Sequence, residues 1–104
     1  MFDQRAMRDM MKQAQQMQAQ MEKAQQALAE ETVEGSAGGG MVTVTFTGQL
    51  DITAISIDKD AVDPDDVEML QDMVLSAVKD GLERAKALQQ ERLSAITGGM
   101  QLPF

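Results

Sequence analysis

The sequence predicts an α+β fold, in which a long N-terminal helix, a three-stranded antiparallel meander and a long C-terminal helix follow one another. Three observations support this. Apolar residues recur at helical spacing near the start, alternate with a period of two in the middle, and return to helical spacing in the last third. With 104 residues, the chain is expected to form a single domain over residues 1–104.

The first helix is expected over roughly residues 4 to 31. Its apolar side chains alternate at spacings of three and four, which is the pattern of a heptad seam. The seam consists of Met7, Met10, Ala14, Met17, Met21, Ala24 and Leu28. Because so narrow a seam packs on another helix rather than on a broad sheet, we expect Met17 and Met21 at a helix–helix or dimer interface.

Three strands are expected in the middle of the chain. "TVEG" predicts a short, weak edge strand, and the glycines of "GSAGGG" predict a hairpin connection. "MVTVTFTG" is the clearest strand, because its apolar residues alternate with threonines. After a turn at residues 48–51, "ITAISID" predicts a third strand with Ile52 on the face opposite to its other two isoleucines. The residues expected in the core or at a dimer interface are Val42, Val44, Phe46, Ile55 and Ile57.

The last helix is expected to begin within "DPDDVE". Asp63 would be its N-cap and Pro64 its first residue, since both types are favoured there. The apolar stripe continues to about Ile96, and "TGGMQLPF", about residues 97–104, is expected to be a mobile tail.

These lengths predict a homodimer. At about 1.5 Å per residue the two helices would be about 40 and 50 Å long, whereas a compact domain of this size has a radius of gyration of about 13 Å. A lone protomer would therefore expose much of the methionine seam and the open edges of a small sheet. A second copy of the chain would cover both.

The composition argues against an enzyme. The chain has no His, Cys, Trp or Tyr, so the usual general base, nucleophilic thiol and transition-metal ligands are missing. The acidic run "DKDAVDPDDVEM" fails as an EF-hand, because Asp63 and Met69 stand where that loop needs Gly and Glu. No catalytic residue, metal site or cofactor is expected, and a calcium sensor remains only as an outside alternative.

The charge is unevenly distributed. The net charge is −8, yet residues 1–29 carry +1 and residues 84–104 carry +2, so the acid is concentrated in the middle. No run of apolar residues is long enough to span a membrane, and no membrane partner is expected. The absence of cysteine is consistent with a reducing cytoplasm.

Several motifs, in order along the chain, resemble the YbaB/EbfC family of bacterial nucleoid-associated proteins. They are "MMKQAQQMQAQM", "GGGMVTVTFTG", "ISID", "DVEMLQDMVLSAV" and "GMQLPF". The resemblance implies a tweezer-like homodimer joined largely through its sheets, which binds DNA through its projecting helices in the cytoplasm and nucleoid.

The resulting hypothesis is a protein that binds duplex DNA with little sequence preference. Its DNA-binding residues would be the basic side chains of the two helices, namely Arg5, Arg8, Lys12, Lys23, Arg84, Lys86 and Arg92. Neutralisation of phosphates by these side chains would supply the affinity. The alternative is a dimeric adaptor that binds proteins of replication or recombination through its acidic middle or its methionine-rich helices.

Overall fold

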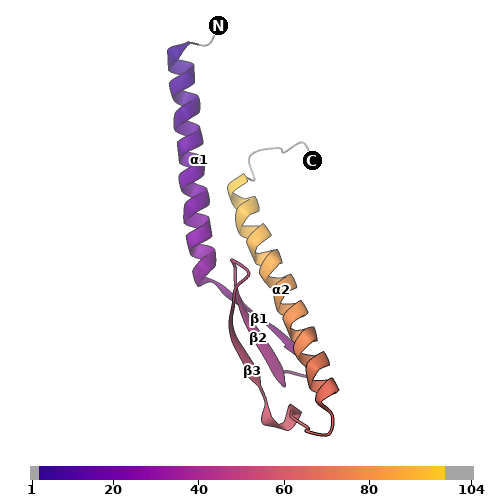
Figure 1. Ribbon diagram of the computed structural model, residues 1–104. Helices are drawn as coiled ribbons and strands as arrows, with labels where there is room; N and C mark the ends of the chain where they lie inside the picture. Colours follow the sequence, from indigo (N-terminus) through magenta and orange to yellow (C-terminus); the bar gives the residue numbers. More distant parts are fainter. Residues whose placement is uncertain (1–2, 98–104) are drawn as a thin grey trace.

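The computed structural model describes residues 3–97, which form two long helices and one small sheet (Figure 1). In chain order the elements are α1 (Gln4–Glu30), β1 (Thr32–Ala37), β2 (Val42–Thr47), β3 (Ile52–Ile57), the short 3-10 helix η1 (Lys59–Ala61) and α2 (Val67–Thr97). The molecule is elongated, with extents of 75 × 26 × 16 Å. This arrangement confirms the α+β prediction.

Helix α1 begins after Asp3, whose side chain accepts a hydrogen bond from the backbone N–H of Arg5 at 3.4 Å. Gln, Ala, Met, Lys and Arg dominate its sequence, and all favour helix. The helix ends at Glu30, where Glu31 turns to extended backbone and leads into the sheet. Only the second half of the predicted seam packs within the chain. Leu28 is fully buried, and Met17 and Met21 are partly covered.

The sheet is a simple antiparallel meander with the order β1-β2-β3. The strand predicted from "TVEG" is longer than expected, because all six residues of β1 pair with β2 from Thr32↔Thr47 to Ala37↔Val42. The hairpin connection between them uses three consecutive glycines, residues 38–40, each with positive φ. Glycine adopts this backbone conformation without steric cost, which explains why the connection is built from it.

The prediction that Ile52 lies on the opposite face from the other isoleucines of β3 is wrong. A register shift near Thr45 and Phe46 interrupts the pairing of β2 with β3, so that Ile52 pairs with Phe46 while Ile55 pairs with Val44. Paired residues share a face of a sheet, so the irregularity brings Ile52 onto the same face as Ile55.

Helix α2 covers that face over β1 and β2 but leaves β3 open. Its buried Ala77 and Ala85 pack on the apolar side chains of β2, which supply the rest of the core: Val42, Val44 and Phe46. By contrast, the residues of β3 are all exposed.

The helix and the sheet approach so closely because two glycines meet at the crossing. A Cβ on Gly35 of β1 would lie 2.2 Å from the carbonyl oxygen of Ala77 and 2.2 Å from the backbone nitrogen of Gly81. A Cβ on Gly81 would in turn lie 2.6 Å from the ring of Phe46. A side chain at Gly35 would therefore displace the backbone of the helix, and one at Gly81 would displace the ring of Phe46.

The predicted start of α2 is wrong by three residues. The side chain of Asp63 accepts a hydrogen bond from the N–H of Asp65 at 2.9 Å, and its carbonyl accepts one from the N–H of Asp66. These bonds close a turn that contains Pro64, rather than a first helical turn. Asp66 is the N-cap instead, since its side chain accepts a hydrogen bond from the N–H of Met69 at 3.2 Å.

At its other end α2 extends to Thr97, one residue beyond the predicted end. The remainder of the segment expected to be mobile, residues 98–104, lies outside the described residues.

Candidate nucleic-acid interface

The N-terminal half of α1 projects beyond the rest of the molecule (Figure 1). Every residue from 4 to 16 is exposed, and we call this stretch the arm. The sheet, α2 and the remainder of α1 form the base. Among residues 3–97, no element covers the arm, so each of its faces is open to possible partners.

One face of α1 is basic. Its positive side chains are Arg5, Arg8, Lys12 and Lys23, which we call the basic stripe. Their spacings of three, four and eleven residues place them within about 60° of one another around a helix with 3.6 residues per turn. All four are exposed, and none forms an ion pair within residues 3–97.

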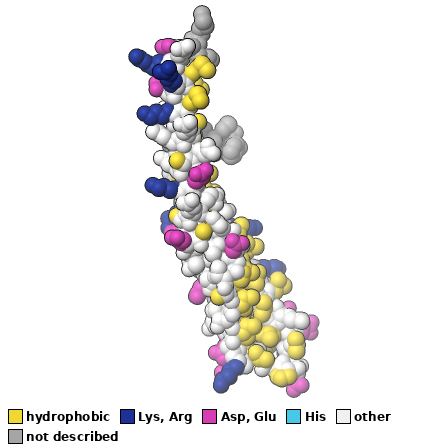
Figure 2. Space-filling model, turned by 60° about the vertical axis from the view of Figure 1, so that its left-hand side comes forward, with side chains coloured by type: hydrophobic (Ala, Val, Ile, Leu, Met, Phe, Trp, Pro, Cys, Tyr) yellow, Lys and Arg dark blue, Asp and Glu magenta, His cyan; other side chains and the backbone are white. Residues whose placement is uncertain are grey.

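The opposite face of the arm is apolar. Met7, Met10 and Met11 are 54%, 60% and 62% exposed. Met7 and Met10 lie about 130° to 170° around the helix from the middle of the basic stripe, and Met11 lies between the two faces, one turn after Arg8. In Figure 2, the Lys and Arg side chains of the upper part of the molecule lie along one edge, and hydrophobic side chains lie along the other edge near the tip. The arm is therefore divided lengthwise into a cationic face and a methionine face.

The basic residues predicted on α2 are placed differently. Arg84 donates to Asp80, one turn earlier, at 3.3 Å, and Lys86 is exposed without an ion pair in the described part of the chain. Arg92 is held by Glu31 at the end of α1, with Nε 3.0 Å from one carboxylate oxygen and Nη2 2.7 Å from the other. The structure thus does not bring all seven predicted cations into one surface.

The two paired carboxylates bind protons less readily than usual. The hydrogen bonds from Arg92 lower the pKa of Glu31, and the same pair raises the pKa of Arg92. The pKa of Asp80 is lowered mainly because it accepts a hydrogen bond from the backbone N–H of Ser36 at 3.0 Å, and further by Arg84. The Arg92–Glu31 pair joins α2 to the end of α1, and the hydrogen bond from Ser36 to Asp80 joins α2 to β1, whereas the Arg84–Asp80 pair lies within α2. These contacts therefore belong to the architecture of the base.

The acidic segment lies at the opposite end of the molecule from the arm (Figure 1). Residues 58–68 carry six carboxylates and one lysine, and the molecule is 75 Å long. At physiological ionic strength the Debye length is about 8 Å, so these carboxylates are screened from the tip of the arm. Within residues 3–97, no three carboxylates are arranged so that they could hold a metal ion.

A second exposed surface lies at the base, where hydrophobic side chains gather over the lower part of the molecule (Figure 2). The large hydrophobic side chains that remain exposed in the base are Ile52, Ile55, Ile57, Val62, Val67, Met69 and Leu75, each between 41% and 54% exposed, and the three isoleucines share one face of β3. We call this surface the base patch. Of the residues predicted for the core or an interface, Val42, Val44 and Phe46 are buried inside the protomer, whereas Ile55 and Ile57 belong to this patch. Its other members were not predicted from the sequence, because the periodicity of a helix or strand does not reveal which apolar residues remain uncovered.

The described helices give no indication of a membrane span, since none of them is both long and apolar enough to cross a bilayer.

Comparison with known proteins is informative over nearly the whole chain. Residues 3–100 match the model of the YbaB/EbfC DNA-binding family. A nucleoid-associated protein of Acetivibrio thermocellus is 53% identical over 88% of this chain and 81% of its own length. One from Chloroflexus aurantiacus is 49% identical over 90% of this chain and 94% of its own length.

The fold itself has also been seen in a crystal. The structure of an uncharacterized protein from Helicobacter pylori matches with a TM-score of 0.71 and covers 97% of this chain and 100% of that one. At 21% sequence identity the likeness concerns the fold alone.

Proposed function

The chain belongs to the YbaB/EbfC DNA-binding family, and we propose that two copies of it form a tweezer-shaped homodimer that binds duplex DNA along the basic stripe of each α1. The family is one of nucleoid-associated DNA-binding proteins rather than a known family of enzymes. The nucleoid, within the cytoplasm, is the corresponding location.

The observation that carries this proposal is the position of the basic stripe. Four exposed cations, with no ion pair among the described residues, line one face of a helix whose outer half projects away from the base. Although the protomer has a net charge of −8, its acidic segment is at the other end of the molecule. A duplex that contacts the arm therefore meets a local positive field.

Phosphate contact is the binding mode that these side chains favour. Lys and Arg on a rigid helix can neutralise phosphates and release counterions, and such contacts carry no sequence information. The three phenylalanines are the only aromatic residues, which gives little basis for stacking on unpaired bases. We therefore expect weak binding, on the order of micromolar, with little sequence preference.

The salt dependence of the affinity for DNA tests this binding mode and gives the number of phosphate contacts. If one basic stripe binds, its four cations predict a slope of log affinity against log salt of about −4, and if the stripes of both protomers bind one duplex the slope approaches about −7. Fluorescence anisotropy with a labelled duplex at several salt concentrations measures it.

A variant with Arg5→Gln and Arg8→Gln should bind every duplex more weakly and should lose about 2 to 4 units of slope, depending on whether one or both arms bind. The matched control is Lys59→Gln with Lys79→Gln, which removes the same charge from the base. Equal effects of the two double variants would show that only net charge matters and would contradict the arm as the binding surface. A wild-type protein that does not bind duplex DNA even at low salt would overturn the proposed function.

The homodimer is proposed to form through the base patch. Large contiguous apolar surfaces on soluble proteins usually mark interaction sites, and this one continues the apolar face of an open sheet. Sedimentation at micromolar concentration should give about twice the protomer mass of 11.3 kDa. Ile55→Glu, at a half-exposed position, should yield a folded monomer, because it places a charge in the interface without entering the core. A wild-type monomer, or an unchanged dimer in the variant, would contradict this interface.

The second candidate function, an adaptor for proteins of replication or recombination, is supported by one observation. The methionine face of the arm is exposed, and methionine-rich helical surfaces suit the binding of varied partners. The adaptor becomes the better hypothesis if the arginine variants have no effect on DNA.

A further inference from the structure

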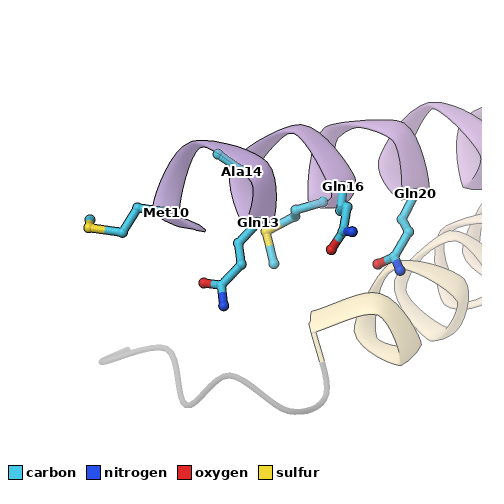
Figure 3. A pocket seen from close by; sticks show the side chains of 6 residues that line it. Met10, Gln13, Ala14, Gln16 and Gln20 are labelled. Atoms are coloured by element: carbon cyan, nitrogen blue, oxygen red, sulfur yellow. The ribbon is translucent and has the colours of Figure 1, made fainter. Parts of the chain in front are cut away.

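A shallow groove runs along α1 from Met10, on the methionine face of the arm, to Gln20. It is lined by Met10, Gln13, Ala14, Gln16, Met17 and Gln20, and its volume is about 470 Å³. Figure 3 shows that the side chains of Gln13, Gln16 and Gln20 point to the same side of α1, toward the end of α2. The groove runs over about two and a half turns of helix, and its floor is methionine and alanine.

Helix α2 ends beside this groove. Ile96 and Arg92 line a neighbouring depression together with residues of α1 that include Gln20, and Gln20 also lines the groove. The chain that follows Thr97 therefore starts at one end of the groove rather than elsewhere on the molecule.

The following segment has the length and chemistry that the groove requires. Residues 98–104, with the sequence GGMQLPF, contain no charged side chain, and Met100, Leu102 and Phe104 alternate. Seven extended residues reach at most about 25 Å. The distance along α1 from Gln20 to Met10 is about 15 Å, so the segment can run the length of the groove.

We propose that residues 98–104 dock along the methionine face of their own arm, with alternate apolar side chains on Met10, Ala14 and Met17. A tether this short keeps the segment at an effective concentration in the millimolar range, which favours it over a second copy of the chain at micromolar concentration. Docking would cover the apolar floor of the groove, whose edge at Gln16 and Gln20 borders the basic stripe at Lys12 and Lys23. The inference does not depend on the proposed DNA binding.

Disulfide trapping tests the position of the segment, because the chain has no cysteine of its own. Leu102→Cys is combined either with Gln13→Cys, which lies in the groove, or with Gln15→Cys. Gln15 is also exposed and is only about 3 Å farther along the axis, but it points to another side, about 160° away around the helix. Under mild oxidation with glutathione, we expect the 13–102 bond to form at least about tenfold faster within one chain than the 15–102 bond. Equal rates would show an undocked tether and overturn the proposal.

Fluorescence gives a second readout that needs no cross-link. The chain contains neither Trp nor Tyr, so Phe104→Trp introduces a single reporter. Its emission should be shifted to the blue relative to free tryptophan. Adding Met10→Gln, at a position 60% exposed in the protomer, should shift the emission maximum back toward that of tryptophan in water without unfolding the base. An emission that depends on protein concentration would indicate a second copy as the occupant. A water-like emission in both backgrounds would likewise contradict docking.

Discussion

The arm and the base of this protein contain similar apolar residues, which are buried in the base and exposed in the arm. In the base, Leu28, Val44 and Ala77 are fully buried, whereas in the arm Met7 and Met10 are more than half exposed. The same heptad seam passes through both regions, and among the described residues it is buried only at the foot of α1, where Gly48 in the turn between β2 and β3 lies against Leu28. The difference shows that a seam predicts which face of a helix can pack, while the neighbouring elements decide how much of it does.

The two regions also divide the charge. The base contains the ion pairs Arg84–Asp80 and Arg92–Glu31, and the arm contains cations that make none within residues 3–97. The charged side chains of the base therefore pair with one another, whereas the cations of the arm form an exposed charged surface. This separation lets each region be altered without the other, which the following predictions use.

The largest effect is expected at the crossing of β1 and α2. Gly35→Ala would place a Cβ 2.2 Å from backbone atoms of α2, and backbone cannot rotate away as a side chain can. We expect a loss of unfolding free energy of about 3 kcal/mol, at the upper end of the usual cost of overpacking. Urea unfolding at fixed protomer concentration measures it, since the proposed dimerisation would make stability depend on concentration.

The control for that variant is Gly39→Ala. A Cβ there meets nothing within 4 Å, but φ is +67°, so the cost should be about 1 kcal/mol from backbone strain alone. If Gly35→Ala were no more harmful than Gly39→Ala, the close packing of helix and sheet described above would be wrong.

The next largest effect is expected when substitutions in the two halves of the heptad seam are compared for their cost in stability. Leu28→Ala removes a fully buried side chain at the foot of α1 and should cost about 2 to 5 kcal/mol. Met10→Ala, on the same seam but 60% exposed, should change stability by no more than about 0.5 kcal/mol. Similar costs at the two sites would mean that the arm is packed as firmly as the base in solution, and would point to an additional partner along it.

The smallest expected effect is on the pH dependence of stability. Because Arg92 lowers the pKa of Glu31 below its ordinary value of 4.5, this carboxylate stabilises the folded state fully above that value. The contribution is lost as the pH falls through the lowered pKa. Glu31→Gln should therefore be slightly less stable than the wild type at pH 7, and the difference should shrink as the pH drops below about 4. Thermal unfolding of both proteins across this range measures the difference, and a gap that widened in acid would contradict the pairing.

Much of the architecture could be predicted from the sequence. The periods of the apolar pattern located both helices and the strands β2 and β3, whereas β1 was expected to be shorter, and the glycines at 38–40 marked the first hairpin connection. The basic stripe was also readable, because helical spacing alone puts Arg5, Arg8 and Lys12 on one face. These features are local, and they depend on residues that are close together along the chain.

Other features were decided only by the tertiary structure. Capping preferences favoured Asp63, yet a closed turn at Asp63 left Asp66 to cap α2. The register shift between β2 and β3 moved Ile52 to the face of Ile55, and the position of α2 over β1 and β2 left that face uncovered. Arg92 was sequestered by Glu31, 61 residues away in the sequence. Each of these outcomes depends on how distant segments pack, and the energies that select between the local alternatives, about 1 kcal/mol for a cap, are small beside those of packing the core.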